Sequence, residues 1–547
     1  MPGNFRAVPR RLRNPLVLLA LAAALIAIVV QSGELGSSDT QHREDATHAL
    51  WTTDPPVFPN EYPQFGIHGR NGTLQTWYGI GQSLLMLPFD VAGTYIERLP
   101  IFADYNGNDP SVRNIVVSYG TNILLNVLTA LVCFRFLRRF HFPVAQSTAG
   151  VLALLLLTTH LHFTQNMMEN NYICLLTLAG FTWQLEWVQT NSRRALVIGS
   201  AALGLNLLTR LTTGVDLLCC ALFVVLVLWL AGIRGSALWS RAKTYAAVTL
   251  PVYAFFILLD RLYQFYRFGS FTNTYAGIAA REWCALNPNL PAGFPFSAPF
   301  HAGFFGALSA PQKSIFLFDP LLILALIIVA AAWRSFTPAI KAYTIATAFM
   351  LLANISLYAR YFTFAGDSAW GDRYVATAAQ LAALLAVPLL MQLWPALRRS
   401  RRALGAALIA ASAIVQASSV AFWLMLELYQ QETLPQPVFV VWLRLKNVAA
   451  FALGKMDAWG LNNAPMHRDP WDYVHITCWN FLPFLLRRAG EAPAWACNLT
   501  LALWWAAIAL LAIVLLRLSQ VLSNVVPPVS RPAVLRVSRP SAAPPTS

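Results

Sequence analysis

Residues 16–30 read LVLLALAAALIAIVV, a run of fifteen residues that carries no charge. A helix that crosses about 30 Å of hydrocarbon needs about 20 predominantly apolar residues, and this run comes close to that length. Further apolar runs that are almost free of charge lie at residues 151–157, 217–230, 315–332 and 503–516. Since a soluble domain has no core large enough to bury so many apolar runs, we expect an integral membrane protein.

The composition agrees with this expectation. The chain has 547 residues, of which 57% are hydrophobic and 12% are charged, whereas a soluble protein carries about 25% charged residues. The net charge of +15 comes from short basic clusters at the ends of apolar runs. Such scattered clusters do not form the basic stripe of a nucleic-acid-binding surface, so we expect no nucleic-acid partner.

The apolar runs predict an all-α fold of about twelve transmembrane helices. The first span follows a basic segment like that of a signal peptide, but it lacks a small-residue cleavage site and precedes further spans, so we interpret it as a retained anchor. The predicted spans lie near residues 15–31, 114–134, 144–162, 171–190, 195–210, 214–232, 245–263, 314–333, 342–362, 374–395, 403–425 and 498–517. An even number of spans places both termini on one side.

The basic residues predict the orientation. Alternate connections contain 22 of the 39 Lys and Arg residues and no Asp or Glu, which is the pattern of cytoplasmic loops. The opposite face then carries the three long loops at residues 32–113, 264–313 and 426–497, with nearly all the acids. We therefore expect a multi-pass membrane protein with cytoplasmic termini and long loops on the opposite face, which in a bacterial inner membrane is the periplasmic face.

The remaining segments complete the predicted organisation. Residues 78–96 would reverse every later basic cluster if they spanned the membrane, so we predict a helix lying at the outer interface. Residues 438–459 are interpreted in the same way. Residues 1–400 form the predicted catalytic module and 401–518 the C-terminal helices, while the Pro-rich residues 519–547 are predicted to be a disordered cytoplasmic tail.

A carboxylate stands just outside the first span, at Asp39. There it can meet a lipid phosphate headgroup and a water-soluble acceptor, and it could accept the acceptor's proton as a general base. Glu44 and Asp45 offer the same chemistry a few residues on. The alternative interpretation is structural, since Ser37 can cap a helix turn in which Arg43 and neighbouring acids are solvated.

Three further blocks carry polar or basic residues on the same side. Residues 78–88, YGIGQSLLMLP, are rich in glycine, but no strand precedes them as a phosphate-binding loop requires. Residues 309–320, SAPQKSIFLFDP, place Lys313 at the outer interface, where it either snorkels or binds an anion. Residues 366–374, GDSAWGDRY, place an arginine beside acids at a membrane exit, as an ion-paired anchor or a phosphate ligand.

Together, these blocks resemble bacterial members of the protein O-mannosyltransferase-like superfamily, the GT-C glycosyltransferases. The resemblance is dispersed over residues 15–400 and implies an inverting enzyme whose donor is a sugar linked to polyprenyl phosphate. The acceptor would be an envelope glycan, lipid or protein. The chain departs from the family in two places: Asp39 stands where many relatives have an Asp-Glu pair, and residues 371–374 read GDRY where relatives often have GPRY.

The resemblance implies a role for each candidate residue. Asp39 would be the catalytic base, while Arg373 and Lys313, with Arg210, would hold the phosphate. The other predicted substrate-binding residues are Arg43, Tyr78, Gln82, Trp370, Asp372 and Tyr374. His42 and His48, with the nearby acids, have the composition of a metal site but no recognisable ligand spacing, so we predict no cofactor and assign no metal ligands, and dependence on a divalent metal stays open.

Two other classes of protein remain open. A twelve-helix secondary transporter or flippase would normally show internal repeats and charges at the membrane midplane. We find no repeat, and the acids nearest to a midplane, Asp216 and Asp319, lie within two turns of an external end. The other alternative is a scaffold without catalysis. A disulfide among Cys284, Cys478 and Cys497 is compatible with their positions in the long loops.

Overall fold

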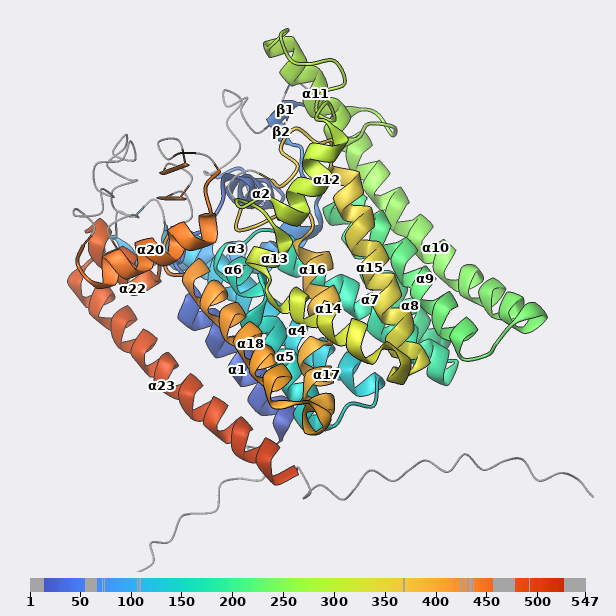
Figure 1. Cartoon of the computed structure of the whole chain (residues 1–547). Coiled ribbons are helices and arrows are strands. Elements are labelled where there is room, and N and C mark those ends of the chain that lie inside the picture. Colours follow the sequence, from blue (N-terminus) through green and yellow to red (C-terminus); the bar gives the residue numbers. More distant parts are fainter. Residues whose placement is uncertain are drawn as a thin grey trace, which may run out of the picture.

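A computed structural model of the chain shows a bundle of helices. It describes residues 14–54, 66–70, 72, 74–105, 107, 110–366, 369–423, 426–427, 430–431, 435, 437–455, 478–490 and 492–525. Figure 1 shows long helices crossing the middle of the molecule, with shorter elements gathered at one end, around α2, α11 and α12. We call this end the loop end.

Helices lie at all twelve positions where the sequence predicts a span. Their bounds are α1 (Pro15–Val30), α4 (Val112–Arg139), α5 (Val144–Leu157) with α6 (His160–Gln165), α7 (Asn170–Thr190), α8 (Arg193–Thr209), α9 (Gly214–Leu230), α10 (Gly235–Phe268), α13 (Ile315–Phe318) with α14 (Leu321–Ala332), α15 (Pro338–Tyr358), α16 (Ala376–Ala383) with α17 (Ala386–Leu393), α18 (Arg399–Ser419) and α23 (Ala494–Val525).

Among the described residues, seven helical segments are long and apolar enough to cross a membrane. They are Val112–Arg139, Leu211–Leu230, Gly235–Phe268, Pro338–Tyr358, Ala376–Ala396, Arg399–Ser419 and Ala494–Gln520. Three shorter apolar helices cover Pro15–Val30, Val144–Leu157 and Leu321–Ser335. The mostly helical fold is therefore confirmed, and the structure supports seven spans by length and composition, not the predicted number of twelve.

The other elements range from single 3-10 turns to the 17-residue helix α3. They are α2 (Ser38–His48), β1 (Gly66–His68), β2 (Leu74–Thr76), α3 (Gly81–Glu97), α11 (Tyr275–Leu286), α12 (Phe300–Ser309), α20 (Val440–Ala452), α22 (Leu482–Ala489) and the single 3-10 turns Pro100–Phe102, Leu211–Thr213, Trp333–Ser335 and Trp394–Ala396. β1 and β2 form an antiparallel hairpin in which Ile67 faces Gln75.

Local sequence explains where several helices begin. Asn14 caps α1 by accepting a hydrogen bond from the amide of Leu16, and Pro15 occupies the first turn. Ser37 caps α2 in the same way through the amide of Thr40. A side-chain oxygen at this position satisfies one of the amides that a helix leaves without a partner. Asp39 follows in the first turn of α2, where the helix dipole favours a negative charge.

The predicted interfacial and disordered segments differ in their bounds. Residues 78–96 contain α3, which is not among the helices long and apolar enough to span and which packs against α2, α4 and α8. Residues 438–459 contain α20, which ends at Ala452. Of the predicted tail, residues 519–525 belong to α23, which continues to Val525, and residues 526–547 lie outside the described residues.

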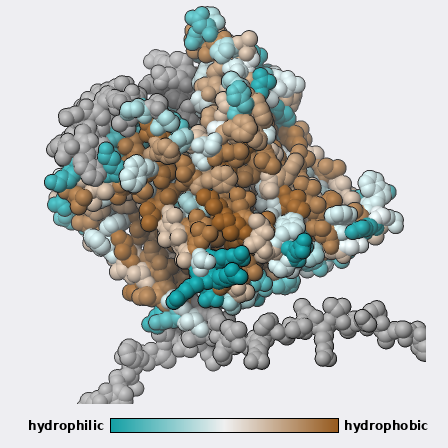
Figure 2. All heavy atoms as spheres, in the orientation of Figure 1, coloured by the Kyte–Doolittle hydropathy of each residue, from teal (hydrophilic) through white to brown (hydrophobic). Residues whose placement is uncertain are grey.

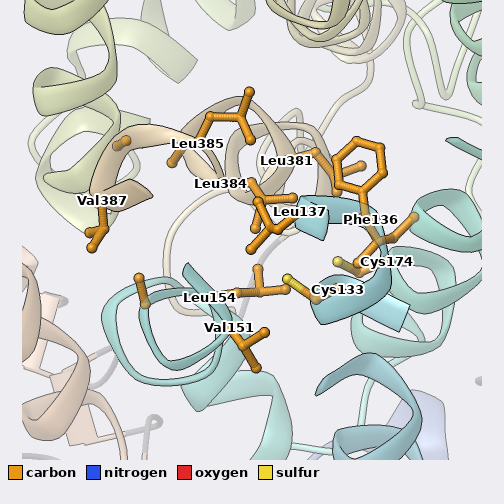
Figure 3. Close-up of a cluster of buried hydrophobic side chains, with 14 of the residues drawn as sticks. Cys133, Phe136, Leu137, Val151, Leu154, Cys174, Leu381, Leu384, Leu385 and Val387 are labelled. Carbon is orange, nitrogen blue, oxygen red and sulfur yellow. The ribbon is translucent and has the colours of Figure 1, made fainter. Parts of the chain in front are cut away.

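The core is a layer of apolar side chains where α4, α5, α7, α16 and α17 meet. Figure 3 shows that these side chains point toward one another from the five helices: Cys133, Phe136, Leu137, Val151, Leu154, Cys174, Leu381, Leu384, Leu385 and Val387. All of them are buried. Close packing of this kind holds helices together in a bilayer, where lipid tails are as apolar as leucine.

The outer surface of the bundle is also apolar. Leu218 on α9, Leu250 on α10 and Leu503 on α23 are each about 60% exposed or more. Figure 2 shows hydrophobic surface across the middle of one face, with hydrophilic patches toward its ends. A soluble monomer rarely exposes so large an apolar area, and a surrounding bilayer accounts for it.

Three of the predicted spans are interrupted, between α5 and α6, between α13 and α14, and between α16 and α17, and the first two breaks contact each other. α5 ends at Leu157 and α6 begins at His160, while α13 ends at Phe318 and α14 begins at Leu321. Asp319, in the second break, accepts hydrogen bonds from the amide and the hydroxyl of Thr159, in the first, at 2.7 and 3.1 Å. Asp319 thus satisfies a backbone amide that the break between α5 and α6 exposes, as buried polar groups require.

Candidate active site

The predicted base and the predicted phosphate ligand meet at the loop end. Arg373, in the segment before α16, donates from Nη1 to Oδ2 of Asp39 on α2 at 2.7 Å. The side chains are 13% and 17% exposed, respectively, so the pair is shielded but reachable from solvent. The two residues are 334 positions apart, and only tertiary packing could bring them together.

Gly366 makes room for this arginine. Its φ of +74° lies in the left-handed region that glycine adopts without strain. A Cβ atom at residue 366 would lie 2.4 Å from Cγ and Nε of Arg373. Only glycine at this position therefore leaves Arg373 in contact with Asp39.

Tyr78 forms a second wall of the site. Its hydroxyl hydrogen-bonds Asp39, and the guanidinium of Arg43 lies 4.0 Å from the centre of its ring. The glycines that follow allow the close approach, because a Cβ at Gly79 would lie 2.2 Å from the carbonyl oxygen of Leu208, at the end of α8. The glycine-rich block thus packs against the helix end that precedes Arg210.

Glu169 joins two of the predicted substrate-binding arginines. It forms an ion pair with Arg43 at 2.9 Å and a second ion pair with Arg210. Its side chain is 3% exposed. Sequence reasoning did not select Glu169, and the only available signal was its position between two spans on the acid-rich side. The pairing itself depends on tertiary structure, since Arg43 and Arg210 come from α2 and the end of α8.

A small pocket that opens to solvent adjoins this cluster. Arg210 and Arg373 both lie near the ring of Tyr374, at 5.1 and 5.2 Å from its centre. The pocket is lined by Asn170, Ile173, Arg210, Thr212, Thr213, Asp216, Asn354, Tyr358, Arg373, Tyr374, Thr377 and Ala378. The lining combines two guanidinium groups with neutral polar side chains and the carboxyl group of Asp216, so it offers charged donors for an anion and polar partners for hydroxyl groups.

The charges in the cluster control its protonation. Burial acts against ionisation of Asp39, but the charges of Arg373 and Arg43 outweigh it and lower the pKa of Asp39 to about 2. Burial likewise opposes the charge on Arg373, yet the neighbouring Asp39 raises the pKa of that guanidinium. Burial lowers the pKa of His42, on the same helix, to about 4. At neutral pH, Asp39 and Arg373 are therefore both charged, while His42 is neutral.

Other predicted site residues lie behind the pocket wall. Lys313 donates from Nζ to the carbonyl oxygens of Ala369 and Gly371, at 2.9 and 3.2 Å. Trp370 is completely buried, with its ring 4.8 Å from that of Phe318. These contacts fix the turn that leads to Arg373, so the structure places Lys313 and Trp370 as supports for that turn.

Asp372 and Gln82 are also buried. Burial raises the pKa of Asp372 to about 7, although Lys313 acts in the opposite direction. Gln82 donates from Nε2 to the carbonyl oxygen of Met167 at 3.2 Å, which holds α3 against the segment that carries Glu169. The structure thus brings Asp39, Arg43, Tyr78, Arg210, Arg373 and Tyr374 into one cluster, with Gln82, Lys313, Trp370 and Asp372 around it.

The two alternative bases belong to a different cluster. Glu44 is fully buried and accepts from Arg113 at 3.1 Å. Arg113 also pairs with Asp90 at 3.0 Å, and Asp90 in turn contacts His48 at 3.1 Å. Asp45 lies 3.8 Å from the same arginine. We call Glu44, Asp45, His48, Asp90 and Arg113 the Arg113 cluster.

The Arg113 cluster contains three carboxyl groups but only two basic side chains, Arg113 and His48. Burial raises the pKa of Glu44 to about 8 and that of Asp45 to about 6, although Arg113 acts against both shifts. Asp39 alone among the three candidate bases has an ion pair with Arg373. The geometry therefore favours Asp39 as the residue that faces the pocket arginines, with Glu44 and Asp45 docking α2 onto α3 and α4.

Two further predictions concern metals and disulfides. In the part of the chain that the structure describes, no group of three or more His, Cys, Asp or Glu side chains is arranged to hold a metal ion. His48 contacts Asp90, whereas His42 lies near Asp39, so the residues with a metal-site composition are divided between two clusters. The thiols of Cys284, Cys478 and Cys497, all described, are not joined in a disulfide.

Known proteins show limited similarity to this chain. No protein-family model matches it, and no curated protein matches it. The chain is similar to the oligosaccharyltransferase of Archaeoglobus fulgidus, crystallised in complex with zinc and sulfate, with 15% identity and a TM-score of 0.44. The match covers 85% of this chain and 61% of the other. A likeness of this degree assigns neither a family nor an activity to this chain.

Proposed function

We propose that this chain is a GT-C-like membrane glycosyltransferase that moves a sugar from a polyprenyl-phosphate donor to an envelope glycan, lipid or protein. The observation that carries the proposal is the contact between Asp39 and Arg373 at 2.7 Å, beside a pocket that Arg210 also lines. A carboxylate and two guanidinium groups are the parts that this transfer requires.

Each group has a defined role in the proposed reaction. The acceptor hydroxyl attacks C1 of the sugar, and its proton passes to the carboxylate of Asp39. The bond between C1 and the phosphate oxygen breaks, and attack from the opposite side inverts the anomeric centre. The lipid phosphate leaves with one more negative charge than it had in the donor, and Arg373 and Arg210 stabilise that charge.

The surrounding residues would hold these groups in place. Tyr78 hydrogen-bonds Asp39, and Tyr374 lines the pocket beside both arginines. Lys313 adds a positive charge and fixes the turn before Arg373 through two carbonyl oxygens. Positioning of this kind matters because catalytic groups misplaced by about 1 Å lose much of their effect.

The test is sugar transfer by the purified full-length protein in lipid nanodiscs. The protein is incubated with a panel of undecaprenyl-phosphate sugars, each with a radiolabelled sugar, and with envelope extract as the source of acceptors. We expect that, with one donor of the panel, the amount of undecaprenyl phosphate released equals the amount of labelled sugar transferred to the acceptor. The matched controls are the Asp39→Asn variant, expected to be nearly inactive, and the Arg98→Ala variant, which removes an exposed ion pair with Asp54.

The same purified protein, reconstituted in sealed vesicles, tests the transporter or flippase alternative. Asp216 accepts a hydrogen bond from Thr177 at 2.8 Å, and Asp319 binds Thr159. Both acids nearest to a midplane thus serve as acceptors in helix packing. Uptake of labelled solute by vesicles that contain the protein, without transfer from any donor in the panel, would replace the transferase proposal with the transporter.

A further inference from the structure

In the proposed reaction, Arg373 interacts with both Asp39 and the donor phosphate. In the structure its Nη1 donates to the carboxylate of Asp39, and the proposed function also assigns it to the donor phosphate. The guanidinium carries a single positive charge, so the base and the phosphate share it. Donor binding should therefore change the state of the base, an inference that rests on the proposed function.

Four groups face Asp39, and Arg373 is the one that acts most strongly on its charge. Arg43 and His42 face it from α2, Tyr78 from the segment after β2, and Arg373 from the segment before α16. His42 is neutral at pH 7, and Tyr78 offers a hydrogen bond without charge. Arg43 also pairs with Glu169 at 2.9 Å, whereas Arg373 contacts Asp39 directly at 2.7 Å, so of the two arginines Arg373 acts more strongly on Asp39.

A carboxylate in this field is a poor base. With a pKa of about 2, Asp39 accepts a proton far less readily than a carboxylate of ordinary pKa, and general-base catalysis improves as the pKa approaches the working pH. A phosphate bound to Arg373 would change this in two ways. It would take part of the guanidinium charge, and it would bring a negative charge close to Asp39, and both effects favour the protonated carboxyl.

We propose that binding of the donor phosphate to Arg373 converts Asp39 from an ion-pair partner into the working base of the reaction. Proton abstraction from an acceptor would then depend on a donor already in place, whichever substrate binds first. After transfer, the lipid phosphate leaves, Arg373 pairs again with Asp39, and the carboxyl releases the acceptor's proton to water. Asp39 has a path for that proton because its side chain is 17% exposed.

Carbodiimide labelling tests this coupling without requiring turnover. Carbodiimides react with protonated carboxyl groups, so at pH 5 the rate of modification of Asp39 reports its protonated fraction. The probe is undecaprenyl phosphate, added to the purified full-length protein, and modification is measured by peptide mass spectrometry. Because each unit of pKa changes the protonated fraction about tenfold, we expect modification of Asp39 to rise about tenfold or more with the probe.

Two controls isolate the effect. Asp54 pairs with Arg98 in an exposed position, and its modification should not respond to undecaprenyl phosphate. In the Arg373→Gln variant, Asp39 should react rapidly without the probe, and the probe should add nothing. This variant also shows that carbodiimide can reach Asp39, so a lack of reaction in the unmodified protein is not a matter of access.

The outcomes separate this inference from the proposed function. If undecaprenyl phosphate binds, as measured with the labelled lipid, and sugar transfer occurs, but Asp39 labelling stays unchanged or falls, the coupling is wrong and the glycosyltransferase stands. If undecaprenyl phosphate does not bind and no donor is used, both are wrong. Equal labelling of Asp39 in the Arg373→Gln variant and the unmodified protein would also overturn the coupling, since Arg373 would then not control that carboxyl.

Discussion

At the residue scale, Asp39 is the group on which the proposed chemistry depends. Asp39→Asn keeps the shape of the side chain but removes the charge that accepts the proton. We expect turnover in the transfer assay to fall by about 10² or more, the usual contribution of a positioned base, while expression and melting temperature stay near normal. The matched variants Glu44→Gln and Asp45→Asn should cost less activity. An active Asp39→Asn with an inactive Asp45→Asn would move the base to Asp45.

Arg373 gives the second prediction at this scale. Arg373→Ala should raise the KM for the donor several-fold or more and change the KM for the acceptor less, because a charge-assisted contact to phosphate is lost. Arg373→Lys should restore only part of the donor affinity, since lysine lacks the planar fork of arginine. Donor kinetics unchanged in both variants would mean that Arg373 only anchors the segment before α16.

At the scale of elements, the glycine-rich block positions the Tyr78 segment against α8. Gly79→Ala would place a Cβ 2.2 Å from the carbonyl oxygen of Leu208, and such overpacking costs about 1–3 kcal/mol. We therefore expect a lower melting temperature and reduced transfer. Gly214→Ala is the matched control, because a Cβ at Gly214 meets nothing within 4 Å. Equal behaviour of the two variants would show that the Tyr78 segment does not need this close approach.

The docking of α2 through the Arg113 cluster gives a pH-dependent prediction. Burial raises the pKa of Glu44 from 4.5 to about 8, so the folded protein binds this proton more tightly than the unfolded chain. The stability that this provides is fully present below pH 4.5 and is lost as the pH rises through about 8. We expect the melting temperature to fall between pH 4.5 and about 8 and to level off above it, and to fall less in Glu44→Gln. An equal fall in both proteins would exclude Glu44 as its source.

At the scale of the whole molecule, the one-sided distribution of basic residues predicts the orientation. Single cysteines introduced at positions 39 and 281 should react with a membrane-impermeant thiol reagent from the periplasmic side, and those at 194 and 401 should not. A single cysteine at position 457, which lies outside the described residues, is also expected to react from the periplasmic side. The cysteines are introduced into a variant that lacks Cys284, because this native cysteine is exposed and would react itself. Labelling of a cysteine at position 401 from the periplasmic side would show that the predicted orientation is wrong.

The sequence by itself determined the helical architecture. Helices lie at every predicted span because long apolar runs form helices for a local reason: each residue's side chain prefers hydrocarbon to water, and each backbone group finds its partner within the same segment. The orientation predicted from the basic clusters rests on equally local counts. The helix breaks between α5 and α6 and between α13 and α14 were not predicted, because an apolar run does not reveal where a partner such as Asp319 satisfies an interrupted backbone.

Only the tertiary structure decided which charges meet. The sequence supplied Asp39, Arg210 and Arg373 as candidates, but not the 2.7 Å contact across 334 positions, nor Glu169 as the link between Arg43 and Arg210. It also could not separate Asp39 from Glu44, whose spacing along α2 turns it toward Arg113. An ion pair depends on the packing of distant helices, and the strength of a base depends on the burial and charges that this packing creates.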